Sequence, residues 1–188
     1  MANADTPRGF WPIRHLSGGT IRANKYTIAS AYATNIFPGD VVKLVAGGGI
    51  EAAAAGNRLL GVFQGVKYTA ADGSQVYAKY WPASTVATDI EATVYDDPNI
   101  LFGAQSSGSS VAADVGELAD HVAGAGSTTT GQSAHEINGT STTGAAGFRI
   151  IDKIDQPDNA WGTNVLLVCQ TYQHEFNEHI DADGTAGV

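Results

Sequence analysis

Residues 37–66, FPGDVVKLVAGGGIEAAAAGNRLLGVFQGV, decide the fold class of this 188-residue chain. Two runs rich in β-branched and apolar residues, 40–45 and 59–66, flank a shorter return segment at 50–55. Three consecutive glycines at 47–49 separate the first run from the return segment, and glycine is the residue that tight turns favour. The stretch therefore predicts a β-hairpin followed by a third strand.

The same three glycines invite a second interpretation, a phosphate-binding loop. Such a loop ends in Gly-Lys-Ser/Thr and leads into a helix whose N-terminus receives the phosphate. Here the glycines lead into Ile50, and residues 52–55 are too few to form that helix. A hairpin turn is therefore the prediction.

Further strands are predicted on both sides of this stretch. Asp72-Gly73 is a hairpin turn between strands at 65–69 and 75–81. Other segments with the β-branched and aromatic content of strands are 23–29, 90–95, 100–104, 148–154 and 164–172. No helix longer than about eight residues is expected, and the best candidate is a short turn near 112–118. We predict a mainly β protein, a compact β-barrel or β-sandwich of jelly-roll or tulip-like form.

The predicted organisation is one β domain, residues 23–176, with additions at both ends. Residues 1–22 contain two closely spaced prolines, which exclude a helix and favour an extended N-terminal arm. Residues 103–147 are rich in Gly, Ser, Thr and Ala and are expected to form a loop-rich insertion in which Val122 and Ile137 are buried. Residues 177–188 are expected to form an acidic C-terminal tail.

The charges are distributed unevenly around the net charge of −9. Residues 1–30 hold four basic groups and one acidic group, whereas the other 158 residues hold six basic and eighteen acidic groups. Between Lys79 and Arg149 there is no Lys or Arg, so this region cannot neutralise the phosphates of a nucleic acid. No stretch approaches the roughly 18 apolar residues that span a membrane. The asymmetry favours an N-terminal arm that contacts an acidic partner.

Four residues of the arm are candidates for that contact: Arg8, Phe10, Trp11 and Arg14. The two aromatic side chains lie on a segment that cannot form a core by itself, so they must pack on the body or on a partner. Two arrangements are open. In one, the arm reaches a neighbouring subunit and its arginines pair with carboxylates there; in the other, it folds back as an edge strand on its own sheet. We predict the first.

A polar segment near the C-terminus, QTYQHEFNEHIDADG at 170–184, raises the question of a metal site. His174 and His179 lie five positions apart, which places them roughly 140° apart on a helix and on opposite faces of a strand. Zinc sites of the H-E-x-x-H type need a spacing of four. We therefore expect a solvated tail, and we predict no metal, no cofactor and no catalytic residue; an enzyme that uses this tail is the weakest alternative.

Three other polar or reactive positions have ordinary interpretations. Cys169, the single cysteine, lies in the apolar run 165–169 and is expected to be a buried small hydrophobic residue. His121 and His135 have no partner motif nearby and are expected on the surface. No signal peptide opens the chain, so synthesis in the cytoplasm is expected.

Nine segments, in order along the chain, resemble a family of small proteins encoded beside the major capsid protein of tailed bacteriophages. These segments are Ala2–Gly9, Pro12–Gly18, Asn24–Tyr26, Pro38–Leu44, Leu60–Phe63, Tyr95–Phe102, Val115–Gly116, Gly124–Gly131 and Asn164–Val168. They are distributed over most of the chain, and residues 177–188 extend past the resemblance. Members are similar to capsid decoration, or cement, proteins, which are β-rich and commonly trimeric subunits that bind the outside of the expanded head and stabilise it.

The resemblance implies a virion structural protein located on the capsid surface. Its implied partners are the major capsid protein and further copies of itself, as a homotrimer, with no nucleic acid, membrane, cofactor or catalytic residue involved. The alternative is a non-catalytic carbohydrate-binding β-sandwich module on a phage or bacterial surface. In that module Trp81, Trp161 and the seven tyrosines would line a sugar platform.

Overall fold

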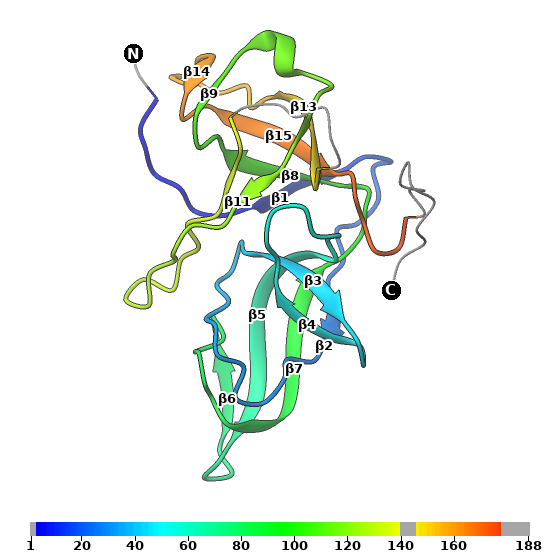
Figure 1. Ribbon diagram of the computed structural model, residues 1–188, viewed down its shortest axis with the longest axis vertical. Helices are drawn as coiled ribbons and strands as arrows, with labels where there is room; N and C mark the ends of the chain where they lie inside the picture. Colours follow the sequence, from blue (N-terminus) through cyan, green and yellow to red (C-terminus); the bar gives the residue numbers. More distant parts are fainter. Residues whose placement is uncertain (1–2, 140–145, 178–188) are drawn as a thin grey trace.

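The computed structural model describes residues 3–139 and 146–177 and arranges them in two lobes along the long axis (Figure 1). The mainly β prediction is confirmed, because antiparallel sheets make up both lobes. The one helical element among the described residues is the short 3-10 turn η1 (Ala112–Asp114), at the place where a helical turn was predicted. The arrangement is sandwich-like, and the strand ladders of the described ranges form no closed barrel. The two ends of the lower sheet meet at a single bridge, where the Ile50 N–H donates to the Thr27 carbonyl at 2.8 Å.

The upper lobe in Figure 1 is built on a five-stranded sheet in the order β1-β8-β15-β13-β10. Its strands are β1 (Trp11–His15), β8 (Ile100–Gln105), β15 (Leu166–Thr171), β13 (Phe148–Lys153) and β10 (Leu118–Ala119). Two small ribbons accompany it: β11 (His121–Val122) with β12 (Glu136–Ile137), and β9 (Ser109–Ser110) with β14 (Gly162–Thr163).

The lower lobe is a six-stranded sheet in the order β2-β7-β5-β3-β4, with β6 paired to β5. Its strands are β2 (Asn24–Tyr26), β7 (Ala87–Tyr95), β5 (Gly61–Ala70), β3 (Val41–Val45), β4 (Gly49–Ala52) and β6 (Gln75–Ala78). The long strands β5 and β7 run down the lobe beside each other, and the β5–β6 hairpin closes its lower end (Figure 1).

The two predicted hairpins are confirmed, and glycine explains both turns. Gly47 and Gly48 have φ of 92° and 80° between β3 and β4, and Gly73 has φ of 84° between β5 and β6. These left-handed conformations are accessible to glycine at little cost and are unfavourable for most other residues. The sequence 37–66 therefore forms the strands that it predicts.

The buried apolar side chains form two clusters, one in the lower lobe and one centred on the upper lobe that also takes in Val41 of β3 and Val62 of β5. The upper cluster includes Phe10, Phe148, Leu167 and Cys169, and the lower cluster includes Phe63 and Trp81 among its fully buried members. Leu167 and Cys169 alternate with less buried neighbours along β15, as expected for a strand with one face on a core. The prediction for Cys169 is confirmed: its thiol is fully buried, and burial raises its pKa well above the usual range.

The segment 103–147 is more than an appendage to this body. It supplies the edge strand β10, and Ile137 on β12 is fully buried in the upper cluster, as predicted. Val122 on β11 is 37% exposed, so its predicted burial is wrong. Residues 140–145 of the segment, like residues 178–188 of the predicted tail, lie outside the described residues.

The predicted N-terminal arm is a strand of its own sheet over residues 11–15. In β1, Trp11 lies opposite Gly103 of β8, and His15 lies opposite Ile100. The folded-back arrangement is therefore the observed one, and the prediction of an arm that leaves its own body is wrong for these residues. The composition of the segment cannot distinguish the two arrangements, because an extended segment can pair with any compatible sheet edge. The strand register in the folded chain decides between them.

A buried carboxylate fixes β2 to the end of β7. Asp96 is 6% exposed, and the Tyr26 hydroxyl donates a hydrogen bond of 2.5 Å to its Oδ2. The Asn24 amide donates to both carboxylate oxygens at 3.0 Å. Burial, followed by the hydrogen bond and the negative charge of Asp96, raises the pKa of Tyr26 far above its usual range. The hydroxyl therefore remains a donor throughout the physiological pH range.

We expect Tyr26→Phe to lower the free energy of unfolding by about 2 kcal/mol, since a charged buried acceptor loses one donor. Chemical denaturation monitored by fluorescence measures this change. Tyr77→Phe is the control, because that side chain is 76% exposed and its hydroxyl loses only water contacts. Equal stabilities of the two variants would contradict the role assigned to the Tyr26 hydroxyl.

Candidate interaction surfaces

The N-terminal segment before β1 is tied to its own subunit by polar contacts. The Asn3 amide donates hydrogen bonds of 2.8 Å to the carbonyls of Ala160 and Thr163, and its oxygen accepts one from the Ala160 N–H. The Thr6 N–H donates to the Gln105 side chain at 3.0 Å. The segment thus follows the surface of the upper lobe instead of projecting from it.

Phe10 is part of the upper core. Its side chain is 2% exposed, and its ring stacks on that of Phe148 with centroids 4.5 Å apart and planes 13° apart. The Phe10 N–H donates to the Gly39 carbonyl, and Gly9 has φ of 79° with Ser133 so close that a Cβ would lie 2.6 Å from it. The prediction that Phe10 contacts a neighbouring subunit is therefore wrong.

Trp11 is half-buried against its own sheet, and Arg8 covers it. A Cβ at Gly103 would lie 2.4 Å from the Trp11 ring, so the indole occupies the space that the glycine leaves. The Arg8 guanidinium lies 3.9 Å from the ring centroid, in a cation–π contact. Trp11 therefore packs within the subunit, while Arg8 stays exposed on top of it.

The outer edge of β1 presents the remaining arm residues to solvent. Arg14 is exposed, and the large apolar side chains Ile13 and Leu16 are 39% and 56% exposed. We call Arg8, Ile13, Arg14 and Leu16 the β1 surface. Pro12 and a register shift between Pro12 and Arg14 interrupt this edge, so it is poorly suited to pairing with another strand. Contacts at this edge would involve side chains.

A second surface is a groove on the outer face of the lower sheet, about 510 Å³ in volume. It crosses β2, β7, β5 and β6, and Tyr77 on β6 is 76% exposed. Sequence reasoning placed β6 correctly and named Tyr77 only as one of the seven tyrosines of a sugar platform, without its neighbours in this groove. The alternation of exposed Gln75 and Tyr77 with less exposed neighbours was the available signal.

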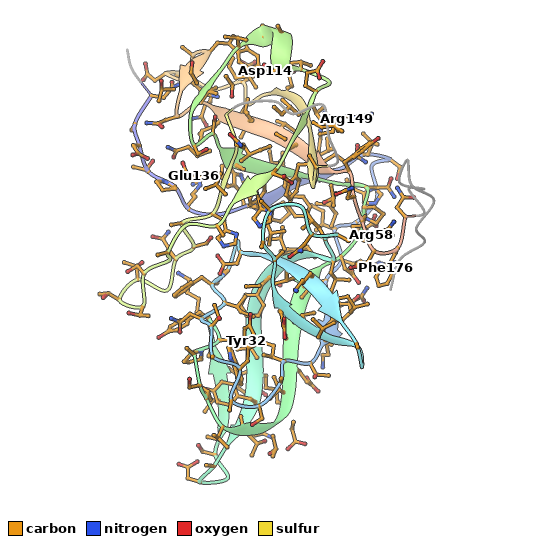
Figure 2. The ribbon with its side chains drawn as sticks, in the orientation of Figure 1. Tyr32, Arg58, Asp114, Glu136, Arg149 and Phe176 are labelled. Atoms are coloured by element: carbon orange, nitrogen blue, oxygen red, sulfur yellow. The ribbon has the colours of Figure 1, made fainter. Side chains whose placement is uncertain are left out.

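A buried polar cluster joins the two lobes, and we call Asp40, His121 and His135 the histidine joint. All three side chains are at most 4% exposed, and the two imidazole rings stack with centroids 5.6 Å apart. The prediction that His121 and His135 lie on the surface is wrong. Figure 2 labels Glu136, the first residue of β12, which directly follows His135. It lies on the side of the upper lobe from which the chain leads toward the lower lobe.

Hydrogen bonds fix the protonation of both histidines of the joint. His135 Nδ1 accepts a hydrogen bond from the Val41 N–H at 3.2 Å, so its proton lies on Nε2, which is 3.5 Å from Asp40 Oδ1. His121 Nε2 donates to the Ala53 carbonyl at 3.0 Å. Each neutral ring thus connects the β11–β12 ribbon to the chain around β3 and β4.

Burial shifts the titration of all three groups. It raises the pKa of Asp40 to about 6, against the opposing effect of hydrogen bonds from Ser133 and the Phe37 N–H. Burial, followed by the charge of the neighbouring His121, lowers the pKa of His135 to about 3. The pKa of His121 is also lowered by burial. At neutral pH the joint is a carboxylate beside two neutral imidazoles.

The C-terminal segment begins as packed structure. His174 is 1% exposed, burial lowers its pKa, and the segment is bound to Leu59 through backbone hydrogen bonds from Leu59 N to Gln173 O and from Glu175 N to Leu59 O. The prediction of a solvated tail is wrong as far as His174. Phe176, labelled in Figure 2, is 59% exposed, and His179 lies outside the described residues.

The two tryptophans expected for a sugar platform are not available at a surface. Trp81 is fully buried and makes an edge-to-face contact with Tyr68 at a centroid distance of 5.5 Å. Trp161 is partly buried and packs against the upper core. A platform built on these two indoles is therefore excluded.

Two further observations concern the kinds of site that the chain carries. Among the described residues, no group of three or more His, Cys, Asp and Glu side chains is placed to hold a metal ion. No helix in this part of the chain is long and apolar enough to span a membrane.

Comparisons with protein-family models, curated proteins and solved structures give no match to this chain.

Proposed function

We propose that the protein is a decoration subunit that binds the outer surface of a tailed-phage capsid and stabilises the head. The sequence resemblance supports the kind of partner, the major capsid protein. The observation that carries the proposal is the exposure of the β1 surface: within nine residues of sequence it has two exposed apolar side chains, Ile13 and Leu16, and two exposed arginines on a protein of net charge −9. Exposed apolar groups flanked by charges are typical of contact surfaces.

The rigid attachment of this surface fits such a role. Phe10 and Trp11 hold β1 to the core from within, so little conformational entropy is lost when its outer side chains bind a partner. Arg8 and Arg14 supply orientation toward carboxylates, because exposed ion pairs contribute little energy. We also propose that the subunit acts as a homotrimer.

The test is binding to expanded heads of the phage that encodes the protein. The double variant Arg14→Glu/Leu16→Asp is expected to lose decoration, measured by co-sedimentation with heads, while its melting temperature changes little because both side chains are exposed. Val86→Asp, on the lower lobe and 63% exposed, is the matched control and should still decorate. Native mass spectrometry of the same samples should show a trimer.

Unchanged sedimentation of the double variant with heads would rule out the β1 surface as the contact. Absence of the protein from purified virions, measured by mass spectrometry, would overturn the decoration function itself. The two outcomes are independent, so the surface and the function are tested separately.

A further inference from the structure

The groove on the lower sheet is formed by two rows of side chains that run across the strands. Cross-strand pairing puts Glu91, Lys67 and Tyr77 in one row, since Lys67 lies opposite both Glu91 of β7 and Tyr77 of β6. The next row contains Lys25 and Gly65, each opposite Thr93. Figure 1 shows the four strands side by side in the order β6, β5, β7, β2.

The groove is hollow because the side chains in the middle of its second row are small or absent. Gly65 has no side chain and Thr93 has a short one, whereas Glu91, Lys67 and Tyr77 form a high wall along one side. A register shift between Phe63 and Gly65 leaves Gln64 exposed beside the glycine. The β-bulge therefore adds an amide to the rim of the groove.

The charges in the groove favour an anionic ligand. Lys25 Nζ lies 2.7 Å from Glu91 Oε2, and this hydrogen bond, followed by the charge of the same lysine, lowers the pKa of Glu91. Lys67 Nζ lies 5.8 Å from the centroid of the Tyr77 ring, and no described carboxylate lies within ion-pair distance of it. Two ammonium groups thus face one carboxylate on a protein that is acidic overall.

The direction of the groove favours a saccharide over a peptide as its ligand. A peptide that adds to a sheet runs parallel to the strands along an edge and uses backbone hydrogen bonds. This groove crosses four strands, offers side chains only, and has an exposed aromatic ring at one end. Tyrosine combines an apolar ring face with a polar tip, which matches the apolar face and the hydroxyls of a sugar ring.

We propose that this groove binds an anionic saccharide. The Tyr77 ring stacks on a sugar, the Lys67 ammonium pairs with its carboxylate or sulfate group, and Gln64, Thr93 and Glu91 bind hydroxyls. The volume of about 510 Å³ is within the range of small-ligand sites, roughly 300–1,000 Å³. This binding goes beyond capsid decoration and does not depend on it.

The experiment is calorimetric titration of the full chain with oligosaccharides of alginate, polygalacturonate and heparin. Maltoheptaose serves as the neutral probe and a poly-glutamate peptide as the acidic peptide. At least one acidic oligosaccharide is expected to bind, with affinity lowered about tenfold by Tyr77→Ala and by Lys67→Ala. Tyr77→Phe should stay within about twofold of the wild type, because the ring face is retained.

Lys43→Ala is the matched control, since Lys43 lies on β3 of the same sheet, outside the groove, and should bind unchanged. Binding that survives Tyr77→Ala, or that is lost equally in Lys43→Ala, would show only general charge attraction and overturn the proposal. It would also be overturned if maltoheptaose or poly-glutamate bound as tightly as the acidic oligosaccharides, or if none of these saccharides bound at millimolar concentration.

Discussion

Replacing Phe10 by alanine is expected to lower the free energy of unfolding by about 3–5 kcal/mol, the usual cost of removing a buried aromatic ring. Phe10 is 2% exposed and stacks on Phe148 in the upper core, so its removal leaves a cavity lined by rigid neighbours. Urea denaturation followed by tryptophan fluorescence measures the change. An arm that reached a neighbouring subunit would give almost no effect in the isolated chain.

Ile13→Ala is the control for Phe10→Ala, because it changes a residue of the same segment that is 39% exposed. Its effect should stay within about 0.5–1 kcal/mol. Deletion of residues 2–16 should be more damaging than either substitution, since it removes both Phe10 and the edge strand β1. If Phe10→Ala were no more destabilising than Ile13→Ala, the packing of the N-terminal segment described above would be wrong.

This prediction also bears on the proposed function. The N-terminal segment has an inner side that stabilises the subunit, Phe10 and Trp11, and an outer side, the β1 surface, that is free to contact a partner. Variants of the inner side should fail through unfolding, whereas variants of the outer side should fail through loss of capsid binding. The two classes are separable by measuring stability and decoration on the same samples.

Local patterns were sufficient for most strands of the two large sheets and for two hairpin turns. The glycines at 47–49 and the pair Asp72-Gly73 determine turns through backbone conformation alone, and the apolar run at 165–169 marks β15 as a strand. Such features depend on residues close in the chain. They are therefore readable without knowledge of the sheet order.

The positions that sequence reasoning missed depend on partners far away in the chain. Phe10 stacks on Phe148, and His135 contacts Val41 and Asp40. The partners in each contact are far apart in the sequence, so no local pattern predicts them. A lone histidine in a polar segment is usually exposed, because burial without hydrogen-bond partners is costly. Here the backbone around β3 and β4 supplies those partners.

The groove was missed for a related reason. Lys25, Lys67 and Tyr77 come from three strands, and only their register brings them into one hollow. A shift of one residue in β6 would turn Tyr77 to the other face of the sheet. Sequence alone identified the β6 strand but could not fix which residues it faces.

The second prediction with a large expected effect concerns the stability of the folded protein at low pH. We expect the free energy of unfolding to fall between pH 7 and pH 5, because the buried histidines stay neutral in the folded state while those of the unfolded chain take up protons. The histidine joint is the main cause, and His174, whose pKa burial also lowers, adds to it. Urea titrations at a series of pH values measure this slope.

The sign follows from the direction of each pKa change. For His135, with a folded pKa of about 3 and an unfolded value near 6.5, stability is present above pH 6.5 and falls by about 1.4 kcal/mol per pH unit below it. His121 acts in the same direction. Asp40 opposes them, because its folded pKa of about 6 exceeds its unfolded value of 3.8, so it gains stability as the pH falls from 6 to 4. Two histidines outweigh one carboxyl group.

The matched variant is His121→Gln/His135→Asn, which keeps the hydrogen bonds and removes the titration. The glutamine amide can still donate to the Ala53 carbonyl, and the asparagine oxygen can still accept from the Val41 N–H, as the two imidazoles do. This variant should be less stable than the wild type at pH 7 and should lose less stability toward pH 5. Parallel pH curves for the two proteins would show that the joint does not titrate on unfolding.

Lowering the pH should also open one region of the protein before the rest unfolds. Protonation of His135 at Nδ1 would place a proton against the Val41 N–H, and protonation of both rings would bring two positive charges together in the stacked pair. The contacts that hold the β11–β12 ribbon to the lower lobe would then be lost before either apolar cluster opens. Amide hydrogen exchange should therefore increase at Val41 and Ala53 at pH values where Phe63 and Leu167 remain protected. Simultaneous loss of protection at all four positions would mean that the joint and the two cores unfold as one cooperative unit.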